Sequence, residues 1–178
     1  MDIFNLKNKT AYKFIKKHLN KAKKSSNKIN GKIHTVGILA ESRLFEAYDF
    51  TKKLSENFGL KPEDFKVLLY ENPDVDNINI NYPGFFENDF GLYGKIKSDE
   101  VKNFADTKFD LLINYCSSNN LFANVLLLRS KARLKAGFYN ENDEFYDISI
   151  KLSDNRIDTF NEELTRYLNI LKIINPAD

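Results

Sequence analysis

The residues that could do chemistry are few in this sequence, and they do not form a catalytic pattern. There are two histidines, His18 and His34, and one cysteine, Cys116, which lies far from both along the chain. A zinc site, or a Ser-His-Asp or Cys-His relay, requires several such residues together. The seven glycines form neither the G-x-G-x-x-G turn of dinucleotide sites nor the G-x-x-x-x-G-K-S/T loop of nucleoside triphosphate sites. We therefore predict no catalytic residue, no metal site and no cofactor.

Polar side chains at the ends of two predicted strands are the best candidates for a ligand site. They are Glu41 and Ser42 after the first strand, and Ser117, Ser118, Asn119 and Asn120 between a later strand and an apolar helix. Parallel α/β sheets bind ligands beyond the carboxyl ends of their strands, and groups at a helix N-terminus can hold an anion. We expect both sets to lie at one end of the sheet and to flank a shallow cleft for a phosphorylated or nucleotide-like ligand. The simpler alternative is that Ser118 or Asn119 only caps the helix.

His34 and Cys116 are both interpreted as structural residues. His34 lies at the N-terminal edge of the first predicted strand, whereas ligands bind at the opposite end. Cys116 lies in an apolar stretch, where a free thiol usually packs as a small hydrophobic group. A lone cysteine cannot form an intramolecular disulfide, and the sequence shows neither a secretory signal nor an apolar run long enough for a membrane span. These features predict a cytoplasmic protein without a transmembrane segment.

The charges of the chain are distributed unevenly. Residues 1–32 contain ten lysines and one acidic residue, Asp2. The rest of the chain contains 17 of the 27 basic residues and 24 of the 25 acidic residues. The N-terminal segment is therefore strongly basic and the body is acidic. Apolar residues recur at helical spacing in residues 10–22, with lysines at most other positions, which predicts a basic amphipathic helix. The candidate polyanion-binding residues are Lys13, Lys16, Lys17, Lys21, Lys23 and Lys24.

Three roles are open for this basic segment. Its charges could attract the phosphates of a nucleic acid, with Tyr12 and Phe14 adding stacking or packing contacts. Anionic lipid is a second target, because basic amphipathic helices also bind membrane surfaces. In the third alternative, the apolar side of the helix packs on the protein's own acidic body while the lysines stay in water.

Strand and helix patterns alternate along residues 32–178. Strands are predicted at residues 33–40, 65–70, 109–115, 133–138 and 145–152, and helices at residues 44–58 before Gly59, after Ser98, from Asn119 or Asn120, and at 158–173. Residues 71–97 are expected to be irregular, with a short strand within 85–90. The alternation predicts an α/β fold, a single Rossmann-like three-layer domain with a mostly parallel sheet and residues 36–39, 67–69 and 111–113 in its interior. A basic N-terminal arm or helix at residues 1–31 precedes it.

Several short segments carry a resemblance to known families. They are Phe-Asp-Leu-Leu-Ile-Asn at 109–114, Ser-Lys-Ala-Arg-Leu-Lys-Ala-Gly-Phe at 130–138, Tyr-Asp-Ile at 146–148, Glu-Leu-x-x-Tyr-Leu at 163–168, and residues 36–39 and 93–97. With them the chain resembles, over nearly its whole length, an uncharacterised family of small cytoplasmic α/β proteins in Bacteroidetes bacteria. A weaker resemblance, over residues 109–138, is to one half of heptosyltransferase-like B-type glycosyltransferases. It implies a shared scaffold rather than transferase activity, because those enzymes need a second half.

These observations favour a non-catalytic binding protein that docks to RNA, the ribosome or another polyanionic assembly through its basic N-terminal segment. A second hypothesis is an enzyme, or the remnant of one, that binds a phosphorylated or nucleotide-like ligand at the two strand ends. A third is a peripheral membrane or complex-assembly factor.

Overall fold

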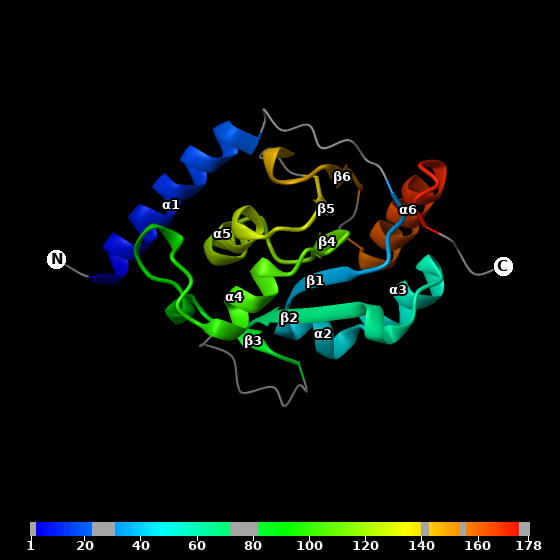
Figure 1. Ribbon diagram of the computed structural model, residues 1–178, viewed down its shortest axis with the longest axis horizontal. Helices are drawn as coiled ribbons and strands as arrows, with labels where there is room; N and C mark the ends of the chain where they lie inside the picture. Colours follow the sequence, from blue (N-terminus) through cyan, green and yellow to red (C-terminus); the bar gives the residue numbers. More distant parts are fainter. Residues whose placement is uncertain (1–2, 23–30, 72–81, 140–142, 154–155, 175–178) are drawn as a thin grey trace.

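In the computed structural model, which describes residues 3–22, 31–71, 82–139, 143–153 and 156–174, six strands form one parallel sheet (Figure 1). The strands are β1 (Val36–Glu41), β2 (Phe65–Tyr70), β3 (Gly84–Phe85), β4 (Leu111–Asn114), β5 (Leu134–Phe138) and β6 (Ile148–Ile150). Their order across the sheet is β3-β2-β1-β4-β5-β6, with β1 and β4 at the centre. The predicted α/β, Rossmann-like architecture with a mostly parallel sheet is confirmed.

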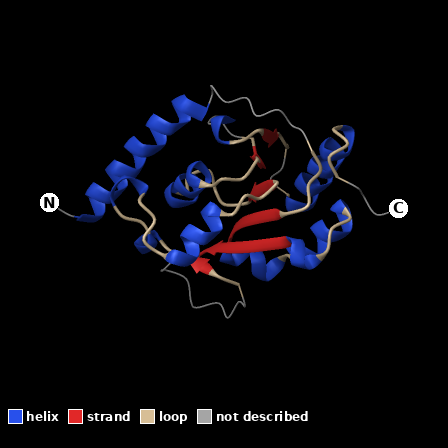
Figure 2. Cartoon of the chain, viewed as in Figure 1, coloured by secondary structure: helices blue, strands red, loops and turns tan. Residues whose placement is uncertain are grey.

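Helices cover both faces of this sheet (Figure 2). They are α1 (Ile3–Ala22), α2 (Ser42–Ala47), α3 (Phe50–Phe58), α4 (Asp99–Asp106), α5 (Leu121–Arg129) and α6 (Ile157–Ile170), with the one-turn 3-10 helices η1 (Pro62–Asp64), η2 (Glu87–Asp89), η3 (Leu92–Gly94) and η4 (Asp143–Phe145). Helices α3 and α6 contribute to the apolar core on one face, and α1, α4 and α5 to the core on the other. Within the described ranges, no helix combines the length and the apolar sequence that crossing a bilayer requires.

The central strands are buried on both faces, which explains their continuous apolar sequences. In β1, Val36 and Ile38 belong to the core under α3 and α6, whereas Leu39 belongs to the opposite core. Residues 36–39, 67–69 and 111–113 are all buried, as predicted. Close packing requires the glycine at position 37, because a Cβ atom there would lie 2.8 Å from Cδ2 of Phe109.

Helix α5 is apolar on all sides because it lies between the sheet and α1 (Figure 1). Its residues 122–127 are all buried. From α1, the side chains of Ala11, Phe14 and Ile15 are buried in the same core. The apolar side of the N-terminal helix therefore packs on the body, which was one of the three predicted alternatives. The helix also begins earlier than predicted, at Ile3 instead of residue 10.

The prediction of one helix at residues 44–58 is wrong, because the structure divides this segment into α2 and α3. Tyr48 is extended (φ −148°, ψ 116°), and Asp49 caps α3 by accepting a hydrogen bond from the backbone N–H of Lys52 at 3.0 Å. The break lets the Tyr48 hydroxyl donate to Asp158 on α6 at 3.0 Å. Gly59 ends α3 in the left-handed conformation (φ 63°), as predicted.

Several strand ends also differ from the predicted ones. The first strand begins at Val36 and not at residue 33, because the backbone N–H groups of His34 and Thr35 donate to Oδ2 of Asp110, at 3.0 and 3.1 Å. Residues 145–152 contain only the short β6, and residues 85–90 contain the end of β3 and an isolated bridge at Phe90. The hydrogen bonds to Asp110 show that one side chain can set a strand end that the apolar pattern does not encode.

Candidate functional site

The sheet has a topological switch point between β1 and β4. Helix α3 follows β1 and packs on one face, whereas α5 follows β4 and packs on the opposite face. The two connections therefore leave neighbouring strand ends in opposite directions and open a crevice beyond their carboxyl ends, where α/β sheets bind ligands. Glu41 ends β1, and Cys116 and Ser117 come shortly after β4.

A hydrogen bond joins the two strand ends across this crevice. The backbone N–H of Ser117 donates to Oε1 of Glu41 at 3.0 Å. Glu41 is the N-cap residue of α2, but its side chain makes no capping bond to that helix. Its carboxylate instead reaches the loop after β4 and accepts a hydrogen bond from the backbone N–H of Ser117. Backbone N–H groups of this kind bind phosphates in related folds.

The loop between β4 and α5 is held by its own hydrogen bonds. Oγ of Ser117 accepts from the backbone N–H of Asn119 at 3.3 Å, and Oδ1 of Asn120 accepts from the backbone N–H of Ala123 at 3.0 Å. Asn120 is therefore the N-cap of α5, so the alternative that placed the cap at Ser118 or Asn119 is wrong. These bonds fix the position of the loop relative to the helix.

A cavity of about 400 Å³ lies beside the Glu41–Ser117 contact, beyond the ends of β4 and β5, and is called the β5 cavity below. This volume is in the range of small-molecule sites. Its lining consists of one carboxylate, two serines, a cysteine, aromatic rings and aliphatic side chains. These residues are Glu41, Leu44, Tyr115, Cys116, Ser117, Ser118, Phe138, Tyr139, Tyr146 and Ile157.

Tyr146 forms a fixed wall of the β5 cavity. Its ring lies on Gly137 of β5, where the Cβ atom of any larger residue would collide with Cζ of the tyrosine. Its hydroxyl accepts a hydrogen bond from Nδ2 of Asn114 at 2.8 Å, and Oδ1 of Asn114 accepts from the backbone N–H of Cys116 at 3.1 Å. Because Asn114 is buried, these bonds hold the ring in one place.

A second hollow of about 370 Å³ also has Glu41 in its lining, and it is called the α1 hollow below. The residues that line it are Asn8, Tyr12, Glu41, Tyr70, Glu87, Ser117, Asn119, Asn120, Leu121 and Phe122. Glu87 is paired with Lys7, whose Nζ lies 3.4 Å from its Oε1. Oδ1 of Asn8 is buried and has no hydrogen-bond partner in the described part of the chain. The Glu41 carboxylate thus borders both spaces.

The charged side chains among the described residues that line the two spaces are the carboxylates of Glu41 and Glu87. No lysine, arginine or histidine is found among the described residues that line either space. Burial raises the pKa of the Cys116 thiol well above its ordinary value, and the charge of Glu41 adds to this effect. The thiol is therefore protonated at neutral pH and is a poor nucleophile.

The predicted ligand residues divide between the two spaces. Glu41 and Ser117 line both, Ser118 lines the β5 cavity, and Asn119 and Asn120 line the α1 hollow. The prediction that the two strand ends lie together and flank a cleft is confirmed, whereas their binding of a ligand stays a prediction. Ser42 is buried and lines neither space.

Sequence reasoning missed the walls that other elements supply. Tyr139 follows β5 and Tyr70 ends β2, so applying the carboxyl-end rule to every strand would have found both. Tyr146, Ile157 and Asn8 come from segments whose positions depend on tertiary packing. No local sequence signal points to them.

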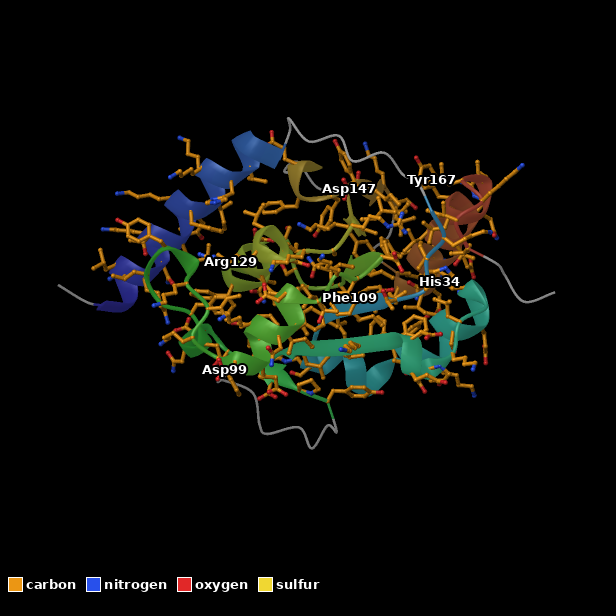
Figure 3. All side chains as sticks on the ribbon, in the orientation of Figure 1. His34, Asp99, Phe109, Arg129, Asp147 and Tyr167 are labelled. Atoms are coloured by element: carbon orange, nitrogen blue, oxygen red, sulfur yellow. The ribbon has the colours of Figure 1, made fainter. Side chains whose placement is uncertain are left out.

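The two histidines lie outside the cavity lining. His34 precedes β1 and is exposed at the end of the sheet where that strand begins, opposite the carboxyl ends (Figure 3). His18 packs on the ring of Phe14, and its Nδ1 lies 2.8 Å from the carbonyl oxygen of the same residue. Cys116 is buried as predicted.

Most of the α1 lysines whose side chains are described face solvent, whereas Lys7 lies over the ring of Phe122 on α5, with its Nζ 5.3 Å from the ring centroid. The exposed ones are Lys9, Lys13, Lys16 and Lys17. Tyr12 lies among them and is 62% exposed. The predicted polyanion-binding residue Lys21 belongs to α1, but its side chain lies outside the described residues, as do Lys23 and Lys24.

Comparison with known proteins gives a family but no characterised relative. A family of unknown function, DUF6913, matches residues 7–171. No curated protein and no solved structure matches the chain significantly. The likeness to heptosyltransferase-like enzymes and a Bacteroidetes origin are not tested by these findings and stay predictions.

Proposed function

We propose that this chain, which belongs to the DUF6913 family of unknown function, is a non-catalytic binding protein that holds a small molecule in the β5 cavity. The position of the cavity carries the proposal. It lies beyond the carboxyl ends of central parallel strands and beside their switch point, which is where ligands bind in this architecture.

The walls of the β5 cavity favour binding over catalysis. The ring of Tyr146 and the loop before α5 are held by hydrogen bonds, so little ordering is needed when a ligand enters. The lining includes hydroxyl groups that can orient a ligand, but its one thiol is buried with a raised pKa. Nucleophilic catalysis needs an activated nucleophile, whereas burial and the charge of Glu41 both raise the pKa of this thiol.

A pair of tryptophan variants tests this proposal. Ser118 lines the β5 cavity alone, and Asn119, the next residue, lines the α1 hollow alone. Both side chains are exposed, so both variants should fold. Small molecules released by denaturing the protein from its native cells would be identified by mass spectrometry and then titrated by calorimetry. We expect Ser118→Trp to abolish binding and Asn119→Trp to weaken it much less. Binding that survives Ser118→Trp, or no bound molecule at all, would contradict the proposal.

A second candidate function is polyanion binding by the outer face of α1. The supporting observation is the cluster of exposed lysines around the exposed ring of Tyr12 on a helix that the body holds in place. Lysines bind phosphates and an aromatic ring can stack on a base. RNA or the ribosome is the proposed partner, and an anionic membrane surface is the competing outcome.

The polyanion hypothesis needs variants that leave the core intact. Removing residues before Lys32 would also remove the buried Phe14 and Ile15, so melting and binding would change together. The triple change of Lys13, Lys16 and Lys17 to Gln is better, with the exposed Lys95, Lys102 and Lys108 changed to Gln as the control. We expect the first variant to lose affinity for an RNA oligomer and to reduce the slope of log affinity against log salt by about 2 to 3.

Equal affinities of the two triple variants for the RNA oligomer would reject this candidate. Binding to phosphatidylserine vesicles without binding to RNA would favour the membrane alternative. We also propose a cytoplasmic location, which the buried free thiol of Cys116 supports.

A further inference from the structure

We propose that the ligand at the carboxyl edge of the sheet carries a positively charged amino group that pairs with Glu41, and that phosphorylated ligands are excluded. This inference rests on the proposed function. It follows from the contact between the Ser117 backbone N–H and Oε1 of Glu41. In sheets of this order, backbone N–H groups at the switch point receive the phosphates of a ligand. Here a carboxylate of the protein itself occupies that position.

The charges around the two spaces also favour a cationic ligand over a phosphate. The acidic residues that line them are Glu41 and Glu87, and the charge of Glu87 is balanced by Lys7. The carboxylate of Glu41 has one described hydrogen bond, from an uncharged backbone N–H group. A phosphate in either space would meet this negative charge, whereas an ammonium group would neutralise it.

Besides Lys7, which is paired with Glu87, three described basic residues lie near the site without lining it. Arg43 is exposed on α2, Lys151 has its Nζ 5.2 Å from the ring centroid of Tyr139, and Arg156 is exposed beside the lining residue Ile157. Their charges are therefore more strongly screened by water than a charge inside the cavity would be.

The aromatic residues of the β5 cavity suit a cation as well. Tyr115, Phe138, Tyr139 and Tyr146 contribute to its lining. The face of an aromatic ring attracts a cation, more strongly when both are removed from water. Rings also pack well on the aliphatic chain of an amine, so the same walls can hold both parts of such a ligand.

The α1 hollow offers an acceptor for a second amino group. Oδ1 of Asn8 is buried without a partner in the described ranges, and Asn8 is one of the residues that line the hollow. A buried acceptor without a hydrogen bond is unfavourable, and a donor group on a ligand would relieve this. Because both spaces border Glu41, a diamine or polyamine is better suited to this edge than a compact monoamine.

Calorimetry with four probes tests the inference on the full chain. The probes are spermidine, putrescine, n-butylamine and inorganic phosphate. We expect the first two to bind most tightly and phosphate not to bind. Glu41→Gln, whose amide oxygen can still accept from Ser117, should weaken spermidine binding roughly tenfold or more, since a charged partner is lost. Glu100→Gln on the exposed surface of α4 is the matched control.

Two results would overturn the inference. One is the absence of amine binding to the wild-type chain. The other is equal spermidine affinity in the wild-type chain and Glu41→Gln. This inference can fail while the proposed function holds. In that case a neutral or anionic ligand would bind the wild-type chain, lose its binding in Ser118→Trp and keep its affinity in Glu41→Gln. That result would keep the β5 cavity as a binding site but reject an amine as its ligand.

Discussion

The guanidinium of Arg129 on α5 lies over the ring of Phe14 on α1, with its Cζ 4.4 Å from the ring centroid. The same side chain donates hydrogen bonds to the carbonyl oxygens of Gly94 and Tyr93. It therefore joins α1, η3 and α5. Thr10 strengthens this junction, since its Oγ1 accepts from the backbone N–H of Tyr93 at 3.0 Å.

The first prediction concerns the packing of α1. Phe14 is 8% exposed, so Phe14→Ala should lower the free energy of unfolding by about 3 kcal/mol, through lost burial and the cavity left behind. Urea unfolding measures this value. Tyr12→Ala, on the exposed side of the same helix, should change it by less than about 0.5 kcal/mol. Similar losses in the two variants would mean that α1 does not pack through Phe14.

The second prediction concerns the wall of the β5 cavity. Gly137→Ala places a methyl group against the ring of Tyr146, and such overpacking typically costs about 1–3 kcal/mol. Because the added methyl group clashes only with Tyr146, the further change Tyr146→Ala should relieve the clash. The double variant should therefore lose less stability than the sum of the two single variants, by about 0.5 kcal/mol or more. Thermal melting of the two single variants and the double variant gives this coupling. Strictly additive losses of stability would mean that the Tyr146 ring does not lie on Gly137.

The third prediction is a dependence of stability on pH. Burial by itself would raise the pKa of the Asp110 carboxyl, but hydrogen bonds from the backbone of His34 and Thr35 and the charge of Arg133 outweigh it, so that this pKa lies below its ordinary value. A carboxyl of this kind stabilises the fold above its unfolded pKa of about 3.9. That stabilisation is lost as the pH falls through the folded-state pKa.

Asp110→Asn should therefore be less stable than the wild type at neutral pH, and the difference should shrink below about pH 4. Urea unfolding between pH 3 and pH 7 follows this change. Glu162→Gln, on the exposed side of α6, is the control for the loss of one negative charge. A difference from the wild type that stays constant over the whole range would exclude a titrating Asp110.

The fourth prediction concerns a buried hydrogen-bond chain between α6 and the sheet. Tyr115 donates to Oδ1 of Asn161 at 2.6 Å, and Nδ2 of Asn161 donates to the Tyr48 hydroxyl at 2.9 Å. Asn161→Ala leaves the buried Tyr115 hydroxyl without this acceptor and should cost about 1–3 kcal/mol. Chemical denaturation measures the loss. Asn103→Ala, on the exposed side of α4, should leave the free energy of unfolding nearly unchanged. An equally small effect of Asn161→Ala would argue against this hydrogen-bond chain.

Patterns along the sequence predicted the architecture because its main determinants are local. The apolar runs of β1, β2 and β4 reflect burial on both faces of a parallel sheet. Ser98 and Gly59 have the cap roles expected of them, since Oγ of Ser98 accepts from the backbone N–H of Val101 and Gly59 takes a left-handed conformation. The order of these elements, together with the rule for strand ends, was enough to bring Glu41 and Ser117 together.

Tertiary structure decided the features that depend on contacts between distant segments. Whether α1 packs on the body or stands free was open, because an amphipathic basic helix suits both; the apolar outer side of α5 settled it by offering Phe14 and Ile15 a surface to cover. The β5 cavity depends on Tyr146, whose ring is placed by a glycine nine residues away and a hydrogen bond from Asn114. The periodicity of a sequence shows which side of a helix or strand is apolar. It does not show which distant side chain packs against that side. The position of Tyr146 in the cavity wall and the position of α1 both depend on such long-range contacts.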